Sequence, residues 1–326
     1  MSKTTLVFPD ALDVPPAYVG ERVDYTLAQS YPDYSRSQFS RWLQDGHIRV
    51  NNQLCKPKYK LQSKDVICFN LDDALTETVV SLLPEAIALE LVYEDDALLI
   101  INKPAGLVVH PGAGNPCHTL VNALLHYHPA LSSLPRAGII HRLDKDTTGL
   151  LIVAKNLPAY THLTRQMQAR EIKRSYCALV HGHVIAGGTL STGYGRHPRD
   201  RLKMTVMGQG RSATTHYAVK QHYLDYPHFT LLEVNLLTGR THQIRVHMAH
   251  LKHPIVGDSL YGGRTRFPPK APESFKIQLQ GFQRQALHAI NLSLQHPLTK
   301  APLAVHAPLP HDFEQLLESL SCLKPT

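Results

Sequence analysis

Residues 138–156, GIIHRLDKDTTGLLIVAKN, decide the fold of the larger part of this 326-residue chain. Two apolar runs, residues 138–140 and 149–154, flank a short polar segment that carries Arg142 and Asp144. Apolar runs of this length bounded by glycine predict buried strands, so we expect the polar segment at a strand end. A carboxylate held there lies on rigid scaffolding at the mouth of the core, where reactive groups are commonly placed.

The pattern of this segment is also typical of two other structures. An ordinary hairpin loop has the same composition, because Asp, Lys, Thr and Gly are frequent in turns. Asp144, Asp146, Thr148 and Gly149 also match the first positions of a calcium-binding EF-hand loop. That loop needs a bidentate Glu at its last position, where this chain has Lys155. The calcium loop is therefore rejected, and the hairpin loop remains open beside a catalytic loop.

Four stretches of the chain resemble, in the same order, the signatures of the RluA/RluD-like family of RNA pseudouridine synthases. They are INKPAGLVVHPGAGN, HRLDKDTTGLLIVAKN, RSYCALVHG and LLTGRTHQIRVHMAHLKHPIVGDSLYGG. Within the family, the chain most resembles the D-type synthases of the large ribosomal subunit. The resemblance implies an α+β protein, in which a small S4-like RNA-binding module precedes a catalytic domain with a mixed, largely antiparallel sheet and peripheral helices.

Composition agrees with an RNA-binding protein of the cytoplasm. Lys and Arg number 34 against 26 Asp and Glu, a formal charge of +8 that favours a polyanionic partner. The five cysteines are scattered and form no CxxC pair, which is typical of a reduced cytosolic protein. No run approaches the roughly 20 apolar residues of a membrane helix, and the N-terminus lacks the apolar core of a signal peptide. We expect a cytoplasmic protein without a membrane partner.

Changes of composition along the chain predict four parts. They are an N-terminal extension (1–19), the S4-like RNA-binding module (20–71), an acidic linker (72–89) and the catalytic domain (90–326). In the module, Phe39, Trp42 and Leu43 have the spacing of one helix face, and Ser35 suits a capping box before it. The segment SRSQFSRWLQDGHIRVNN resembles the S4 domain. The candidate RNA contacts of the module are Arg22, Arg36, Ser37, Arg41 and Lys56.

Such side chains bind the RNA backbone without choosing a base. A merely solvated helix face is the alternative for them. In the catalytic domain, apolar runs and alternation predict strands at 97–102, 172–180, 216–221, 229–236 and 287–294. Helical spacing predicts helices at 118–128, 158–171 and 312–323, and residues 264–280 are expected to form a surface loop. Strands adjacent in sequence with irregular helices favour a mixed, largely antiparallel sheet.

The resemblance also implies roles for individual residues. Asp144 matches the family's catalytic aspartate, Arg245 the arginine that pairs with it, and Tyr176 the active-site tyrosine. Ile244 matches a position that packs against the base. Arg142 matches an arginine that fills the hole in the RNA stack when the target uridine is flipped out. On pattern alone, Tyr176 and Ile244 would be ordinary core residues.

Pseudouridine formation exchanges the C1′–N1 bond for a C1′–C5 bond within one nucleotide, without net redox change. It requires a carboxylate at the sugar, groups that hold the base and exclusion of water, and it needs no metal or organic cofactor. Asp144 could attack C1′ or remove the C2′ proton, and the sequence leaves both routes open. Arg240 and His242 are candidate phosphate contacts. The four histidines His242, His247, His250 and His253 lack both HExxH and a carboxylate at ligand spacing, so we expect no metal site among them.

The expected function is isomerisation of uridine to pseudouridine in 23S ribosomal RNA, in the loop of helix 69. The expected partner is this RNA or a large-subunit assembly intermediate, and the expected state is a monomer. Residues 187–211 follow the D-type least clearly, so target choice could differ there. A synthase for other rRNA or tRNA uridines is one alternative. A ribosome-assembly factor that binds RNA without catalysis is another, although a pure binder has no need of Asp144 in a basic groove.

Overall fold

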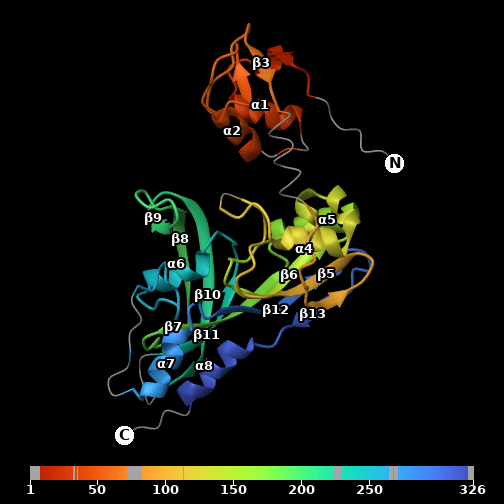
Figure 1. Cartoon of the computed structure of the whole chain (residues 1–326). Coiled ribbons are helices and arrows are strands. Elements are labelled where there is room, and N and C mark those ends of the chain that lie inside the picture. The colour runs from red at the N-terminus through yellow and green to blue at the C-terminus, as the bar shows by residue number, and fades with distance from the viewer. Residues whose placement is uncertain are drawn as a thin grey trace. The chain divides into compact units, whose positions relative to one another are not determined.

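The computed structural model divides into two compact units, Met1–Leu83 and Pro84–Thr326 (Figure 1). It describes residues 8–31, 34, 36–71, 83–112, 114–223, 229–263, 267 and 271–321. Within these residues no helix is both long enough and apolar enough to cross a membrane. The predicted acidic linker, 72–89, straddles the division, and its residues 72–82 lie outside the described part.

The first unit packs two helices against a small antiparallel sheet. Its elements are β1 (Ala11–Asp13), η1 (Pro16–Tyr18), α1 (Val23–Ser30), α2 (Arg36–Asp45), β2 (Ile48–Val50) and β3 (Val66–Phe69), with strand order β1-β3-β2. The predicted stripe of α2 is confirmed, since Phe39, Trp42 and Leu43 are all buried. Strand β1 pairs with β3, although residues 1–19 were predicted as an extension. The predicted capping residue Ser35 lies outside the described residues.

The second unit is built on one large sheet. Its strands are β4 (Leu91–Glu94), β5 (Leu98–Lys103), β6 (Thr148–Ala154), β7 (Lys173–His181), β8 (Gly188–Arg196), β9 (Met204–Met207), β10 (Arg211–His222), β11 (Phe229–Leu236), β12 (Leu287–Gln295) and β13 (Pro302–His306). The order is β4-β5-β6-β12-β7-β11-β10-β8-β9, with β13 also paired to β12. Only the β6–β12 ladder is parallel among the strands described. The predicted mixed, largely antiparallel sheet is confirmed.

Helices cover this sheet from both sides (Figure 1). They are α4 (Leu120–Tyr127), η2 (Pro129–Ser133), η3 (Pro135–Gly138), α5 (Leu157–Ala169), α6 (Gln243–His250), α7 (Glu273–Gly281) and α8 (His311–Ser321). Alternate residues of β5 enter two separate apolar clusters: Leu99 packs with α4, whereas Leu98 packs with α5. A strand buried on both faces has a continuous apolar sequence, which explains why β5 and β6 lack polar alternation.

The central motif forms a loop between a single bridge and a full strand. The expected strand at 138–140 is wrong: only Ile139 pairs, with Val153, because the short helix η3 continues to Gly138. Gly149 has φ +110° in β6, and a Cβ there would lie 2.3 Å from the carbonyl oxygen of Ala289. Ala289 is paired in turn with Tyr176 of β7. Gly149 therefore lets β6, directly after the Asp144 loop, lie close to β12, the strand between it and the strand that carries Tyr176.

Two further segments differ from their prediction. Residues 264–280 were predicted as one surface loop, but α7 begins at Glu273 and buries Phe275 and Leu279, which are spaced for one helix face. Residues 264–266 and 268–270 lie outside the described part. Residues 187–211, for which no structure was predicted, contain strands β8 and β9.

Candidate active site

A buried lysine holds the backbone of the Asp144 loop. Lys103, at the end of β5, is completely buried, and its Nζ donates to the carbonyl oxygens of Lys145, Pro104 and Leu107 at 2.8, 2.6 and 3.0 Å. Burial lowers the pKa of Lys103 to about 7, while the nearby carboxylates of Asp146 and Asp144 oppose that shift. The three carbonyl acceptors match the three N–H groups of a charged ammonium. The backbone next to Asp144 is thus held in place.

Asp144 forms an ion pair with an arginine that is itself anchored. Arg245, on α6, donates from Nη1 to Asp144 Oδ2 at 3.1 Å. Its Nε and Nη2 donate to the two oxygens of Asp258 at 2.7 and 2.9 Å. The Asp258 carboxylate also accepts the backbone N–H groups of Leu260 and Tyr261 at 3.0 Å each. Burial alone would lower the pKa of Arg245, but its bonds and charge pairs with Asp258 and then Asp144 raise it. Arg245 is therefore a permanent cation in a fixed position.

His242 and Tyr261 lie on another side of Asp144. His242 Nε2 is 3.9 Å from Asp144 Oδ1, and His242 Nδ1 is 2.8 Å from the Tyr261 hydroxyl. The backbone of His242 is left-handed, with φ 57°, directly before α6 begins. Burial lowers the pKa of His242, and the Asp144 carboxylate opposes this. The imidazole therefore faces the carboxylate across a gap too long for a direct hydrogen bond.

An apolar surface adjoins these polar groups. Tyr176, Ile244 and Leu143 belong to one buried cluster, and Tyr176 is 4% exposed. Burial raises the pKa of the Tyr176 phenol, so it is a neutral O–H at physiological pH. That hydroxyl has no hydrogen bond within the described part of the chain. A phenol of this kind can stack on a planar base and exchange a proton with it.

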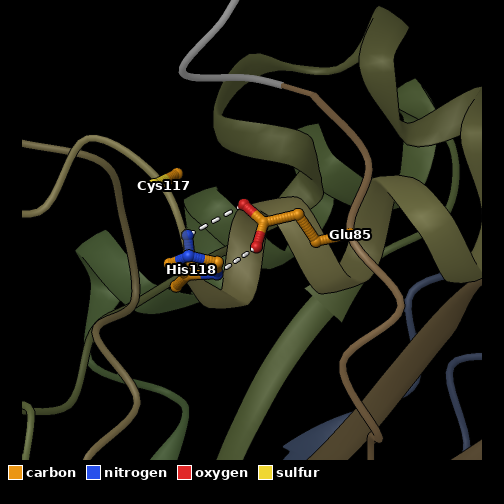
Figure 2. A group of neighbouring side chains, drawn as sticks. All are labelled: Glu85, Cys117 and His118. Atoms are coloured by element: carbon orange, nitrogen blue, oxygen red, sulfur yellow. Dashed lines mark hydrogen bonds and ion pairs between the residues drawn. The ribbon is translucent and has the colours of Figure 1, made fainter.

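A cluster of possible metal ligands lies elsewhere in this unit, at Glu85, Cys117 and His118 (Figure 2). Cys, His and Glu are all zinc ligands. However, one Glu85 oxygen accepts the backbone N–H of His118 at 2.8 Å, and the other pairs with His118 Nδ1. The His118 side chain is 82% exposed. We assign the group as a structural contact in which Glu85 is fastened to the loop before α4.

A family model described as RNA pseudouridylate synthase matches residues 97–250, and an S4 domain model matches residues 21–67. The chain is 49% identical over 301 residues to the ribosomal large subunit pseudouridine synthase D of Escherichia coli strain K12, covering 92% of this chain and 90% of that protein. It is 46% identical over 321 residues to the protein of the same name from Xylella fastidiosa, covering 98% and 95%.

The chain belongs to the RNA pseudouridylate synthase family. It is an RNA pseudouridine synthase, as the resemblance of its motifs implied. The solved structure named human RNA Pseudouridylate Synthase Domain Containing 4 superposes with a TM-score of 0.54 at 26% identity, covering 78% of this chain and all of that one. The predicted fold class, with an S4 domain ahead of the synthase domain, is confirmed.

The structure of the synthase brings five predicted site residues together and leaves two at the rim. Arg245 pairs with Asp144, His242 lies 3.9 Å from it, and Ile244 lies in the same buried cluster as Tyr176. Arg142 and Arg240 are exposed.

The two rim arginines differ in their attachment. Arg240 Nε donates to the carbonyl oxygen of Ser212 at 3.3 Å, which ties it to β10. Burial has the largest effect on the pKa of His242, and the charges of Asp144, Arg245 and Asp258 follow. The charge of Arg142 has a smaller lowering effect, so Arg142 lies within electrostatic range of the site. Both arginines are open to solvent beside the site.

The S4 unit of the synthase holds two predicted RNA contacts on one buried acid. Arg22 donates to both oxygens of Asp24 at 3.0 and 2.6 Å, and Arg36 donates to one of them at 2.9 Å. Asp24 is 3% exposed in its side chain, whereas Arg22 and Arg36 are 37% and 46% exposed. Burial would raise the pKa of Asp24, but the two arginines lower it. The guanidinium groups are thus fixed while part of each faces solvent.

The other predicted contacts of this unit are less constrained. Arg41 is 3.5 Å from Asp45 within α2 and is 66% exposed. Lys56 lines a concave surface of the unit with Asn51, Leu54 and Tyr59. The Ser37 side chain lies outside the described part of the chain.

Sequence reasoning missed Asp258 and Tyr261, which hold Arg245 and His242. Both stand in the segment GDSLYGG, which supports no known short motif by itself. The only signal in the sequence was a glycine, Gly257, directly before the acid. In the structure Gly257 has φ +75° and lies close to the Arg284 carbonyl, in a turn directly before Asp258. An acid after such a turn can reach a neighbouring helix.

Proposed function

We propose that this synthase isomerises uridines of large-subunit ribosomal RNA, in the helix 69 loop of the 23S species, with Asp144 as the catalytic carboxylate. The observation that carries the proposal is the Asp144 carboxylate, which is held by Arg245 beside a buried tyrosine. The names of the relatives with 46 and 49% identity support the large subunit as the source of the substrate.

Asp144 is suited to act at the sugar. Its side chain is 14% exposed, so a flipped nucleotide could reach it while bulk water is largely excluded. Either it attacks C1′ and forms a covalent sugar adduct, or it removes the C2′ proton. In both routes the C1′–N1 bond breaks, the uracil turns and a C1′–C5 bond forms, while C5 loses a proton and N1 gains one. In the second route the proton removed from C2′ is returned to it. Atoms balance within the nucleotide, and no electron carrier takes part.

Arg245 keeps a positive charge beside Asp144 throughout the reaction. The Nε and Nη2 groups of its guanidinium are both hydrogen-bonded to Asp258. Arg245 therefore does not need to reorganise when charge develops at the sugar or base. Its Nη1 donates to Asp144 Oδ2 at 3.1 Å, which fixes the carboxylate that either route uses.

Tyr176 and Ile244 would hold the uracil. The Tyr176 ring offers a stacking face, and its hydroxyl could accept or relay the proton that leaves C5. Ile244 would pack against the base. Arg142, which is exposed beside the site, would occupy the space that the flipped uridine leaves in the RNA stack.

The substrate assignment is tested by incubating the synthase with RNA from cells that lack pseudouridine synthases. The samples are 23S rRNA, bulk tRNA and partly assembled large subunits, each mapped for pseudouridine. New pseudouridines in the helix 69 loop are expected. New sites in tRNA or in other rRNA segments would overturn the helix 69 assignment, and the absence of new sites in all three samples would overturn the rRNA substrate.

A further inference from the structure

The hydroxyl of Tyr261 lies between the sheet and the active site. It accepts the backbone N–H of Met204, the first residue of β9, at 2.9 Å, and it is 2.8 Å from His242 Nδ1. The Tyr261 ring is fixed as well, because the Arg245 guanidinium lies 5.1 Å from its centroid and the Tyr261 backbone N–H donates to Asp258. Tyr261 is therefore held at three points.

Proton counting then decides the state of His242. A phenol has one hydrogen to donate, and the Met204 N–H already occupies a lone pair of its oxygen. If His242 Nδ1 carried a proton and donated it, the Tyr261 hydrogen would have no acceptor among the described residues. If Tyr261 donates to Nδ1, every proton has a partner. The neutral imidazole then carries its own proton on Nε2, the nitrogen that faces Asp144.

We propose that Tyr261 is a positioning residue that holds His242 as a neutral Nε2–H donor beside Asp144. This inference rests on the proposed function, and it gives the Nε2–H a partner: a ribose or phosphate oxygen of the target nucleotide. The gap of 3.9 Å between His242 Nε2 and Asp144 Oδ1 leaves that proton uncommitted in the free synthase. The lowering of the His242 pKa by burial agrees with a neutral ring.

The variant Tyr261→Phe removes only the hydroxyl and keeps the ring against Arg245. We expect its single-turnover rate to fall about tenfold to hundredfold, because a misplaced donor near the reacting atoms costs about that much. The KM for RNA should stay unchanged, since the affinity-giving cations are elsewhere. The matched control is Tyr93→Phe, which removes a hydroxyl that donates to Asp95 at 2.7 Å. Tyr93 lies on β4, the edge strand at the opposite end of the sheet from β9.

A substrate-free readout separates this inference from the proposed function. Long-range ¹H–¹⁵N spectra of the labelled protein report which imidazole nitrogen carries the proton, and a His242→Gln variant identifies the signal among the 21 histidines. We expect Nε2–H in the wild type. In Tyr261→Phe the titration midpoint of His242 should rise, because the neutral ring loses a donor at Nδ1. Tyr93→Phe should change neither the spectrum nor the rate.

Two results would overturn the inference. One is a wild-type His242 that is protonated on Nδ1. The other is a Tyr261→Phe variant whose turnover and His242 midpoint match those of Tyr93→Phe. Failure of Asp144 as the catalytic group would leave the imidazole spectrum unaltered, so the two claims fail separately.

Discussion

The ion pair between Arg245 and Asp258 makes a quantitative prediction about stability. The Asp258 carboxylate accepts two hydrogen bonds from Arg245, at 2.7 and 2.9 Å, and its side chain is 1% exposed. Asp258→Asn keeps the size of this side chain and removes its charge. Removing one partner of a buried pair costs about 3–5 kcal/mol. Arg245 retains Asp144 at 3.1 Å, so we expect the lower end, about 3 kcal/mol of unfolding free energy.

A second pair in the same unit provides the control. Arg284 donates to both oxygens of Asp312 at 2.7 Å each, but the Asp312 side chain is 50% exposed. Water can replace an exposed partner, and such pairs contribute about 0–1 kcal/mol. Asp312→Asn should therefore lower the unfolding free energy by about 1 kcal/mol.

Urea unfolding followed by circular dichroism is dominated by the catalytic unit, which holds most of the helices and strands. The single tryptophan, Trp42, is buried in the first unit, so its fluorescence follows that unit separately. The Trp42 transition should be the same in the wild type and both variants. Equal losses for Asp258→Asn and Asp312→Asn would refute the argument that burial makes the Asp258 pair the stronger one.

Three further predictions concern RNA binding and pH. Asp24→Asn should weaken binding of structured RNA more than it slows conversion of bound RNA, because Arg22 and Arg36 lose the carboxylate that fixes them. An RNA affinity equal to that of the wild type in filter binding would count against this. Arg199→Ala and Arg201→Ala, at the exposed turn between β8 and β9, should each reduce the salt dependence of RNA affinity by about one unit of log–log slope, and an unaltered slope would remove that turn from the RNA interface. Burial lowers the pKa of His288 to about 4, whereas the unfolded imidazole titrates near 6.5. Unfolded chains bind the extra proton between these values, so stability should fall as pH drops below about 6.5, by at most about 1.4 kcal/mol per pH unit for this group. In urea unfolding, the free energy of unfolding of His288→Gln should decline less between pH 7 and pH 5 than that of the wild type. Equal declines in the two proteins would contradict the lowered pKa of His288.

Much of the fold could be predicted because local pattern and tertiary burial agree. The stripe of α2 and the continuous apolar sequences of β5 and β6 each reflect the faces that are buried. Strand β8 was missed since it is rich in Gly and Thr, which removes the apolar alternation, and β9 was missed since it has only four residues, all half-exposed. Helix α7 was missed because the proline-rich start of its segment masked the spacing of Phe275 and Leu279.

The site was predictable only where motif resemblance reached it. Asp144, Arg245 and His242 come from segments about one hundred residues apart, and no periodicity indicates that they meet. Asp258 and Tyr261 act through hydrogen bonds whose partners are set by the turn at Gly257. Contacts of this kind depend on tertiary structure, so spacing in the sequence does not encode them.

The central claim is that the Asp144 carboxylate performs the chemistry, and two isosteric variants of one loop test it most directly. Asp144→Asn and Asp146→Asn each remove one negative charge, and of these two aspartates it is Asp144 that pairs with Arg245. Single-turnover conversion of 23S rRNA is followed by mass spectrometry, with RNA affinity measured alongside. The account predicts no pseudouridine from Asp144→Asn at undiminished RNA affinity, and substantial conversion by Asp146→Asn. Conversion by Asp144→Asn at the wild-type rate would contradict it.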